Sequence, residues 1–226
     1  MLRLKRVSVR RKKLNALFFE PETRFEGEYA SDGGLLVDRA AFEESDLREG
    51  CPCEETEVEA VLADSRRRRA YEKGLWLLDA RDYTERGMTD KLRSDFGAQA
   101  AAAAVARYVE YGLIDDGRYA ARLAEQLLTV QRLSRRQART KLLMKGVPRD
   151  LAEEALDGVE ADPAEQLDAW IQGKFAARLA SGVEGARRKV VDALLRRGFA
   201  YEDVKAALAR WEEASGRQEE ETYDAL

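Results

Sequence analysis

Two adjacent carboxylates, Asp115 and Asp116, are the residues of this sequence that would first suggest metal binding or acid–base chemistry. Adjacent residues on a helix point about 100° apart, and no third ligand lies within sequence reach, so the pair is poorly placed to hold an ion. An aspartate just before Tyr119 can instead cap a helix N-terminus and interact with its positive end. We therefore assign the pair to helix capping and predict no metal site.

Histidine is absent from the 226 residues. This excludes Ser/His and Cys/His nucleophile pairs, a histidine general base and histidine metal ligands. Most familiar hydrolase designs are therefore excluded, and we expect no cofactor. A hydrolase that uses carboxylate-bound metal at Asp115 and Asp116 is the enzymatic alternative that remains.

The two cysteines, Cys51 and Cys53, are separated by one residue. They are too close for an unstrained disulfide and too few for a four-ligand zinc site within one chain. We predict reduced thiols, as in a cytoplasmic protein, with a zinc ion shared between two chains as the less favoured alternative. No run of about 18 apolar residues occurs and no apolar segment follows the basic N-terminus, so we expect no membrane partner.

Basic residues concentrate on one expected helix that begins after Ser134, a candidate N-cap. Several of them are spaced four residues apart, and like charges at that spacing repel one another, so stability alone would not select them. Two interpretations stay open. The basic face contacts an anionic partner or DNA, or it is a solvated face neutralised by the acidic residues of the segment 150–168.

A second group of basic residues occupies the equivalent helix later in the chain, which favours one shared surface. Tyr83 is expected to be an exposed aromatic residue and is added as a partner contact, whereas Trp76, Trp170 and Trp211 fall in apolar stripes and are expected in the core. Arg66 to Arg69 are interpreted as solvated linker charge rather than a DNA clamp. The candidate partner- and DNA-binding residues are Arg132, Arg135, Arg136, Arg139, Lys141, Lys145, Arg187, Arg188, Arg196, Arg197 and Tyr83.

The net charge of −4 conceals an uneven distribution along the chain. Residues 1–13 carry seven basic and no acidic residues, whereas residues 14–65 carry three basic and fifteen acidic ones. Residues 66–149 are again basic, with nineteen basic and ten acidic groups. Because a phosphate responds to the field within about 8 Å at physiological salt, the basic regions keep nucleic acid among the possible partners.

The spacing of apolar residues predicts a mainly α-helical chain with a small strand-containing N-terminal extension over residues 1–65. Leu2 and Leu4, then Val7 and Val9, alternate with polar residues as in short strands, and helical spacing begins at Asp64. Residues 213–226 form an acidic tail that we expect to be frayed or disordered.

Three related helix ends predict an internal repeat. Leucines precede Gly97, Gly146 and Gly198 by four or five residues, and each glycine is suited to the left-handed position that closes a helix. We expect three tandem three-helix repeats, at residues 66–115, 116–161 and 162–212. Units of this size bury little surface alone, so they should stack into a curved, elongated rod.

At these residues the sequence resembles the RecX family of recombinase regulators. The resemblance covers nearly the whole chain except the acidic tail, and its most specific element is the Leu-Ile-Asp-Asp-x-x-Tyr-Ala string. Three positions depart from the family pattern: Gly87 replaces a capping-box glutamate, Leu133 a glycine, and Ala200 an N-cap serine. The matching stretches are Asp82-Tyr83-Thr84, Gly112 to Ala120, Lys145-Gly146-Val147 and Leu194 to Phe199.

The resemblance implies three tandem three-helix repeats and an activity without bond chemistry. Proteins of this family bind the RecA filament on single-stranded DNA, lie along its groove and suppress strand exchange, ATP hydrolysis and repressor self-cleavage. The partner implied for this chain is therefore the RecA–single-stranded DNA filament, with direct DNA contact. The alternative is a stand-alone helical-repeat protein that binds duplex DNA, because helix pairs with a basic second helix occur in such proteins.

Overall fold

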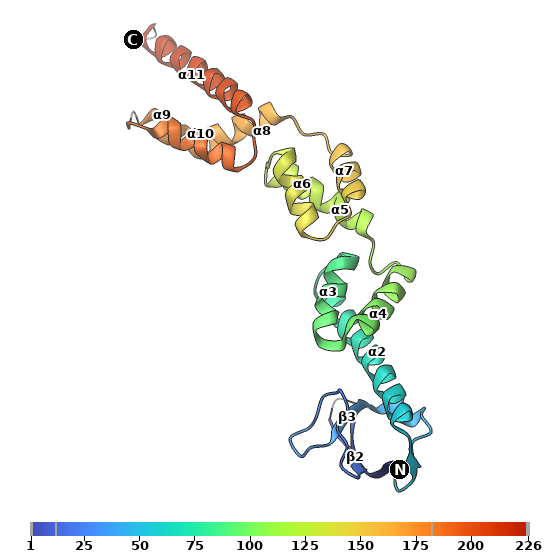
Figure 1. Ribbon diagram of the computed structural model, residues 1–226. Coiled ribbons are helices and arrows are strands. Elements are labelled where there is room, and N and C mark those ends of the chain that lie inside the picture. Colours follow the sequence, from blue (N-terminus) through green and yellow to red (C-terminus); the bar gives the residue numbers. More distant parts are fainter. Residues whose placement is uncertain (1, 12, 182, 225–226) are drawn as a thin grey trace. The chain divides into compact units, whose positions relative to one another are not determined.

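The computed structural model of the protein describes residues 2–11, 13–181 and 183–224 and is mainly helical, with a small sheet near the N-terminus (Figure 1). The predicted fold class is confirmed in this respect. The chain divides into two compact units, Met1–Asp115 (unit 1) and Asp116–Leu226 (unit 2). The predicted curved rod depends on how the units are placed, so it stays a prediction.

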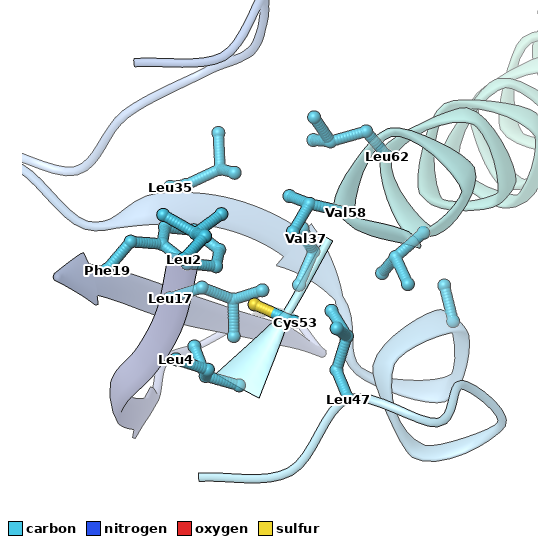
Figure 2. Packing of buried hydrophobic residues seen from close by; sticks show 12 residues of the cluster. Leu2, Leu4, Leu17, Phe19, Leu35, Val37, Leu47, Cys53, Val58 and Leu62 are labelled. Atoms are coloured by element: carbon cyan, nitrogen blue, oxygen red, sulfur yellow. The ribbon is translucent and has the colours of Figure 1, made fainter. Parts of the chain in front are cut away.

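A four-stranded antiparallel sheet opens unit 1, with strand order β3-β2-β1-β4. Its strands are β1 (Leu2–Val9), β2 (Leu14–Glu20), β3 (Leu35–Asp38) and β4 (Pro52–Cys53). In β1, Leu2 and Leu4 point inward toward Leu17 and Phe19 of β2, as the alternating pattern predicts (Figure 2). The short helix α1 (Arg39–Glu43) follows β3.

Helix α2 (Glu55–Ala80) is 26 residues long and belongs to both hydrophobic clusters of unit 1. Its first half places Val58, Val61 and Leu62 against the sheet (Figure 2), and its second half contributes Ala70 and Leu77 to the next cluster. Our sequence prediction began helical structure at Asp64. The helix starts earlier, at Glu55, because Val58, Val61 and Leu62 already have helical spacing. The acidic residues around them face solvent on the other sides of the helix.

The remaining helices of unit 1, α3 (Glu85–Phe96) and α4 (Ala98–Glu110), pack on the second half of α2. Thr84 caps α3 by accepting a hydrogen bond from the Gly87 amide at 3.0 Å, although Gly87 cannot complete a capping box. The buried hydroxyl of Tyr108 in α4 donates to the Tyr71 carbonyl at 2.5 Å. A Cβ atom at Gly74 would lie 2.2 Å from that hydroxyl, so the close approach of α4 to α2 depends on this glycine.

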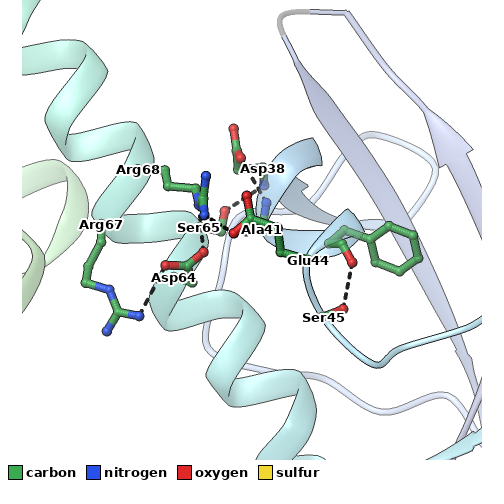
Figure 3. A network of polar contacts seen from close by, with 9 residues as sticks. Asp38, Ala41, Glu44, Ser45, Asp64, Ser65, Arg67 and Arg68 are labelled. Carbon is green, nitrogen blue, oxygen red and sulfur yellow. Dashed lines mark hydrogen bonds and ion pairs between the residues drawn. The ribbon is translucent and has the colours of Figure 1, made fainter.

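A polar network connects α2 to α1 and the end of β3 (Figure 3). The Asp38 amide donates to Ser65 Oγ at 2.7 Å, and Arg68 Nε donates to Asp64 Oδ2 at 2.7 Å while also pairing with Glu44. Burial alone would raise the pKa of Asp64, but hydrogen bonds from Arg68 and Arg67 outweigh it and lower that pKa below 3.8.

The expectation of solvated linker charge at Arg66 to Arg69 is therefore wrong. All four arginines lie within α2, and each bonds a group of unit 1. Arg66 donates to the Glu26 carbonyl and Arg69 pairs with Glu28 at 2.6 Å. Residues three apart lie close together on the surface of a helix, so Arg66 and Arg69 fasten the segment that contains Glu26 and Glu28 to one side of α2.

Unit 2 contains two hydrophobic clusters, one formed by residues between 119 and 161 and one by residues between 167 and 211. Gly97, Gly146 and Gly198 all have positive φ, which confirms the predicted helix ends. The repeat boundaries themselves stay a prediction. The helices of unit 2 are α5 (Asp116–Glu125), the π-helical η1 (Gln126–Val130), α6 (Arg135–Met144), α7 (Arg149–Asp157), α8 (Pro163–Trp170), the π-helical η2 (Ile171–Phe175), α9 (Ala176–Ala180), α10 (Ala186–Arg196) and α11 (Tyr201–Asp224).

Helix α11 begins directly after Ala200, without a serine N-cap, and continues to Asp224. It thus extends into the acidic segment that the sequence predicted to be frayed, whose last two residues, 225 and 226, lie outside the described part of the chain. In the described part, no helix has both the length and the apolar character needed to span a membrane.

Candidate interaction surface

Helix α6, with Ser134 as its N-cap, carries the predicted basic face. Ser134 Oγ accepts a hydrogen bond from the Gln137 amide at 3.2 Å, which confirms the predicted helix start. Ala138 and Leu142 are fully buried, so the charged positions of α6 project away from this apolar side. The amphipathic pattern of the helix therefore decides which of its cations are available to a partner.

Two cations of α6 are neutralised within unit 2. Arg135 pairs with Asp157 at 2.5 Å and Arg139 with Glu153 at 2.6 Å, and both acids belong to the neighbouring helix α7. For these two residues the interpretation as a neutralised face is the better one. Their side chains are half-exposed, so each ion pair contributes no more than about 1 kcal/mol to stability.

The other cations near α6 have different surroundings. Arg132 and Arg136 are exposed, and neither forms an ion pair with any side chain within 2–11, 13–181 or 183–216. Lys141 Nζ donates to Gln131 Oε1 at 3.2 Å, and Lys145 is exposed at the end of the helix. The candidate surface on this helix is therefore carried by Arg132 and Arg136 more than by Arg135 and Arg139.

The N-terminal end of α6 is docked against the C-terminal end of α10. The Ser134 amide donates to the Arg197 carbonyl at 3.4 Å. Gly198 has φ +85°, and a Cβ atom there would lie 2.4 Å from Ser134 Oγ. Only glycine satisfies both conditions, so Gly198 allows the two helix ends to meet.

Side chains of α8 complete this contact by hydrogen bonding to two backbone carbonyls. The Leu128 carbonyl of η1 accepts a 2.7 Å hydrogen bond from Gln166 Nε2. Trp170 Nε1 donates to the Arg132 carbonyl at 2.8 Å. Arg132 has φ +48°, a left-handed conformation. The next residue, Leu133, is the position at which the family pattern has glycine.

Trp170 is surrounded by cations. The Arg197 guanidinium lies 4.1 Å and Lys174 Nζ 5.7 Å from the centre of the indole ring. Both distances are within the range of cation–π attraction. We define the basic junction as the cations at or beside this contact: Arg132, Arg136, Lys174, Arg196 and Arg197. Sequence reasoning missed Lys174, because only the indole between the two repeats brings it near Arg197.

The basic residues of α10 divide between the two ends of that helix. Arg187 pairs with Glu212 of α11 at 3.0 Å, while Arg188 and Lys189 are exposed beside it. Arg196 and Arg197 lie about 13 Å further along the axis, at 1.5 Å per residue. The two groups of α10 are therefore not one cluster, and only the second belongs to the basic junction.

The aromatic predictions need correction in unit 1. Tyr83 is half-buried against the apolar cluster of α2, α3 and α4, with the Arg81 guanidinium 4.4 Å from its ring centre, so it is not the exposed aromatic we expected. Trp76 was expected in the core but is 63% exposed, with Lys73 Nζ 4.4 Å from its ring centre. Trp170 is half-buried, as an apolar stripe predicts.

The candidate groups for metal or thiol chemistry are dispersed. Asp115 is exposed just before α5, and Asp116 opens that helix and is buried. Cys51 is exposed and Cys53 is buried, and both are free thiols. Burial raises the pKa of the Cys53 thiol. Among the described residues, no three Cys, Asp or Glu side chains gather as a metal site.

Comparisons with known proteins match this chain to one family. The family described as RecX, second three-helix domain, matches residues 115–156. A regulatory protein RecX from Trichlorobacter lovleyi is 32% identical over 135 residues, which are 57% of this chain and 86% of that protein. A regulatory protein RecX from Clostridioides difficile is 22% identical over 163 residues, covering 72% of this chain and 77% of its own length.

Solved structures show the same fold. A crystal structure of a regulatory protein RecX aligns with a TM-score of 0.59 at 18% identity and covers 91% of this chain and 100% of its own. The RecX structure from Lactobacillus salivarius aligns with a TM-score of 0.56 at 19% identity, covering 66% of this chain and 98% of its own.

Proposed function

Because this chain belongs to the RecX family of regulatory proteins, we propose that it is a non-enzymatic regulator of RecA that binds the RecA filament on single-stranded DNA. In this proposal the protein contacts adjacent RecA protomers in the filament groove and inhibits recombination, ATP hydrolysis and the coprotease activity that triggers the SOS response. The observation that carries the proposal is the basic junction, whose cations form no ion pair with the side chains that the structure describes.

The chemistry of the basic junction suits a polyanion. An arginine guanidinium offers a planar fork of N–H donors that fits a phosphate or a carboxylate. Arg132, Arg136 and Arg196 form no ion pair with the residues that the structure describes, so their binding to a partner need not first break a contact of their own. The hydrogen bonds of Gln166 and Trp170 hold the two helix ends together and thus keep these cations at a fixed spacing.

Inhibition follows from occupancy and needs no catalytic group. A chain of helical repeats that touches several protomers gains from effective concentration, because each further contact is intramolecular once the first has formed. Binding should therefore favour the filament over free RecA. It should also weaken with salt, because contacts to phosphate release bound counterions.

The experiment is a titration of RecA ATPase on single-stranded DNA with the protein and two double variants. Arg136→Gln/Arg196→Gln removes two charges of the basic junction, and Arg135→Gln/Arg139→Gln removes two charges that Asp157 and Glu153 already neutralise. We expect the first pair to raise the half-inhibitory concentration about tenfold, and the second less than about threefold.

Two results would contradict the proposal. Absence of ATPase inhibition by the unmodified protein at stoichiometric ratios and moderate salt would reject RecA regulation. Equal effects of the two double variants would reject the basic junction as the contact. Thermal unfolding followed by circular dichroism serves as the control that both variants are folded.

Duplex DNA binding in the helix–turn–helix manner is the second candidate, and the docking of α6 speaks against it. A recognition helix reads bases with residues near its N-terminus. In unit 2 that end of α6 is covered: Ser134 is 7% exposed and its amide meets the Arg197 carbonyl. Tight binding of duplex DNA in the absence of RecA, resistant to competition by unlabelled random duplex, would favour this candidate instead.

A further inference from the structure

The strand β1 carries unpaired cations on the side opposite its hydrophobic contacts. Arg3, Lys5 and Arg6 are exposed, while Leu2 and Leu4 are buried in the core. Within the described part of the chain, none of these three cations takes part in an ion pair. The outer side of the sheet therefore carries a positive charge that the folded protein does not neutralise through ion pairs.

A β-bulge increases this charge density. The register pairs Leu4 with Phe19, then Arg6 with Phe18 and Val7 with Leu17, so Lys5 is an extra residue between two regular pairs. If β1 had no bulge, strict alternation from Leu4 would turn Arg6 inward and Val7 outward. With it, Val7 packs against the core while Lys5 and Arg6 are both exposed.

Aromatic rings accompany these cations. The Arg6 guanidinium lies 4.1 Å from the ring centre of Phe18, and the Arg24 guanidinium lies 5.8 Å from that of Tyr29. Lys5 and all four of these residues line one open groove of about 600 Å³. Stacking on Phe18 restrains the Arg6 guanidinium, and the exposed side chain stays accessible to an anion.

The acidic residues of the groove lie outside β1, so the edge of the groove along β1 is basic. Asp32 is paired with Arg10, and Glu20 and Glu22 lie at the end of β2 and in the following turn. The bulge is on β1, where residues 2–11 include five basic residues and no acid. An anionic ligand would thus approach along β1 and meet the aromatic rings beside it.

We propose that the outer side of the N-terminal sheet is a binding surface for single-stranded DNA, through Lys5, Arg6 and Phe18. This inference goes beyond the proposed function, because it assigns a nucleic-acid contact to unit 1 that operates without RecA. Arginine planes held beside half-buried aromatic rings suit a single strand, because its phosphates are accompanied by unstacked bases that can stack on a guanidinium. A duplex keeps its bases stacked and would use only the charges.

The experiment measures fluorescence anisotropy of a labelled oligothymidylate, about 20 nucleotides long, with the full chain and no RecA. Lys5→Gln/Arg6→Gln is compared with Lys91→Gln/Arg93→Gln, a matched loss of two exposed charges on α3 of the same unit. The first pair should weaken binding about tenfold and reduce the slope of log affinity against log salt by about 1.4, at 0.7 per phosphate contact. The second should change affinity less than about threefold.

Phe18→Leu separates stacking from charge. It should weaken binding about fivefold and leave the salt slope unchanged, because the Arg6 guanidinium loses the ring that it stacks on while the cations remain. Lys5→Gln alone, at an exposed side chain, provides a second variant should the double variant unfold.

Three outcomes would overturn the inference. They are absence of oligothymidylate binding at low salt, equal losses in the two charge pairs, and equal affinity for a duplex of the same length. Loss of DNA binding in Arg136→Gln/Arg196→Gln together with unchanged binding in Lys5→Gln/Arg6→Gln would assign the DNA contact to the basic junction instead. The ATPase titration remains a separate readout, so failure of this inference leaves the proposed function testable.

Discussion

Replacement of Gly198 by alanine should destabilise unit 2 and disturb the basic junction. Two contributions add. A residue other than glycine at φ +85° costs about 1 to 2 kcal/mol. The new Cβ atom would also lie 2.4 Å from Ser134 Oγ, so that hydroxyl must move and α6 loses an N-cap hydrogen bond worth about 1 kcal/mol. The expected loss of unfolding free energy is therefore about 2 to 3 kcal/mol.

Gly185 provides the matched control, because it has φ +74° in the same unit but no atom within 4 Å of the position that a Cβ atom would take. Gly185→Ala should cost only the backbone part, about 1 to 2 kcal/mol. Urea unfolding is followed by tryptophan fluorescence in a Trp76→Phe background. Trp76 is exposed and lies in unit 1, so the remaining fluorescence reports unit 2.

A double-mutant cycle isolates the contact. In a Ser134→Ala background the cap is already lost and the closest atom is gone, with Gln137 Cβ at 3.3 Å the nearest that remains, so Gly198→Ala should then cost only slightly more than Gly185→Ala. The coupling between the two positions should be about 1 kcal/mol. The reasoning is refuted if Gly198→Ala and Gly185→Ala cost the same in the unmodified background, or if the two changes of the cycle are additive.

Three other perturbations test unit 1. Gly74→Ala should lower the stability of unit 1 by more than about 1 kcal/mol, because the Tyr108 ring occupies the space that the new Cβ atom needs. Alanine normally stabilises a helix relative to glycine, so a gain in stability on urea unfolding would contradict this packing. The lowered pKa of Asp64 stabilises the fold above about pH 4, the unfolded value, and this advantage disappears as pH falls through the folded pKa. The stability difference between the unmodified protein and Asp64→Asn, at most about 1 kcal/mol, should therefore shrink between pH 6 and pH 3, and a difference that does not depend on pH would exclude the ion pairs as its source. Under native conditions an aromatic disulfide reagent should modify Cys51 at least about tenfold faster than Cys53, whose thiol is buried with a raised pKa, and equal rates before denaturation would show that Cys53 is accessible.

Local signals in the sequence were sufficient for much of the fold. Alternation of Leu2 and Leu4 predicted β1, the hydroxyl of Ser134 predicted a helix start, and glycines such as Gly146 predicted helix ends, because each of these effects acts within a few residues. The family was recognised from the string around Asp115 for a similar reason, since it lies where one set of helices ends and the next begins.

Contacts between distant residues could not be predicted in the same way. Spacing placed Arg135 and Arg139 with Arg136 on one basic helix, but only the position of α7 decides which of them meets Asp157 or Glu153. The exposure of Trp76 likewise depends on where α3 and α4 leave α2 uncovered. Burial and pairing in these cases are tertiary properties, and a helical period does not determine them.

The single helix α2 runs through both hydrophobic clusters of unit 1 and connects them rigidly. At 1.5 Å per residue, its 26 residues extend about 39 Å without a break. A molecule bound to the sheet would therefore also fix the orientation of α3 and α4 about the α2 axis, because α2 is continuous between the sheet and these helices. Truncation of the protein at residue 66, to remove the sheet, would cut α2 near its middle. The helices α3 and α4 would then keep only the second half of the helix that they pack on.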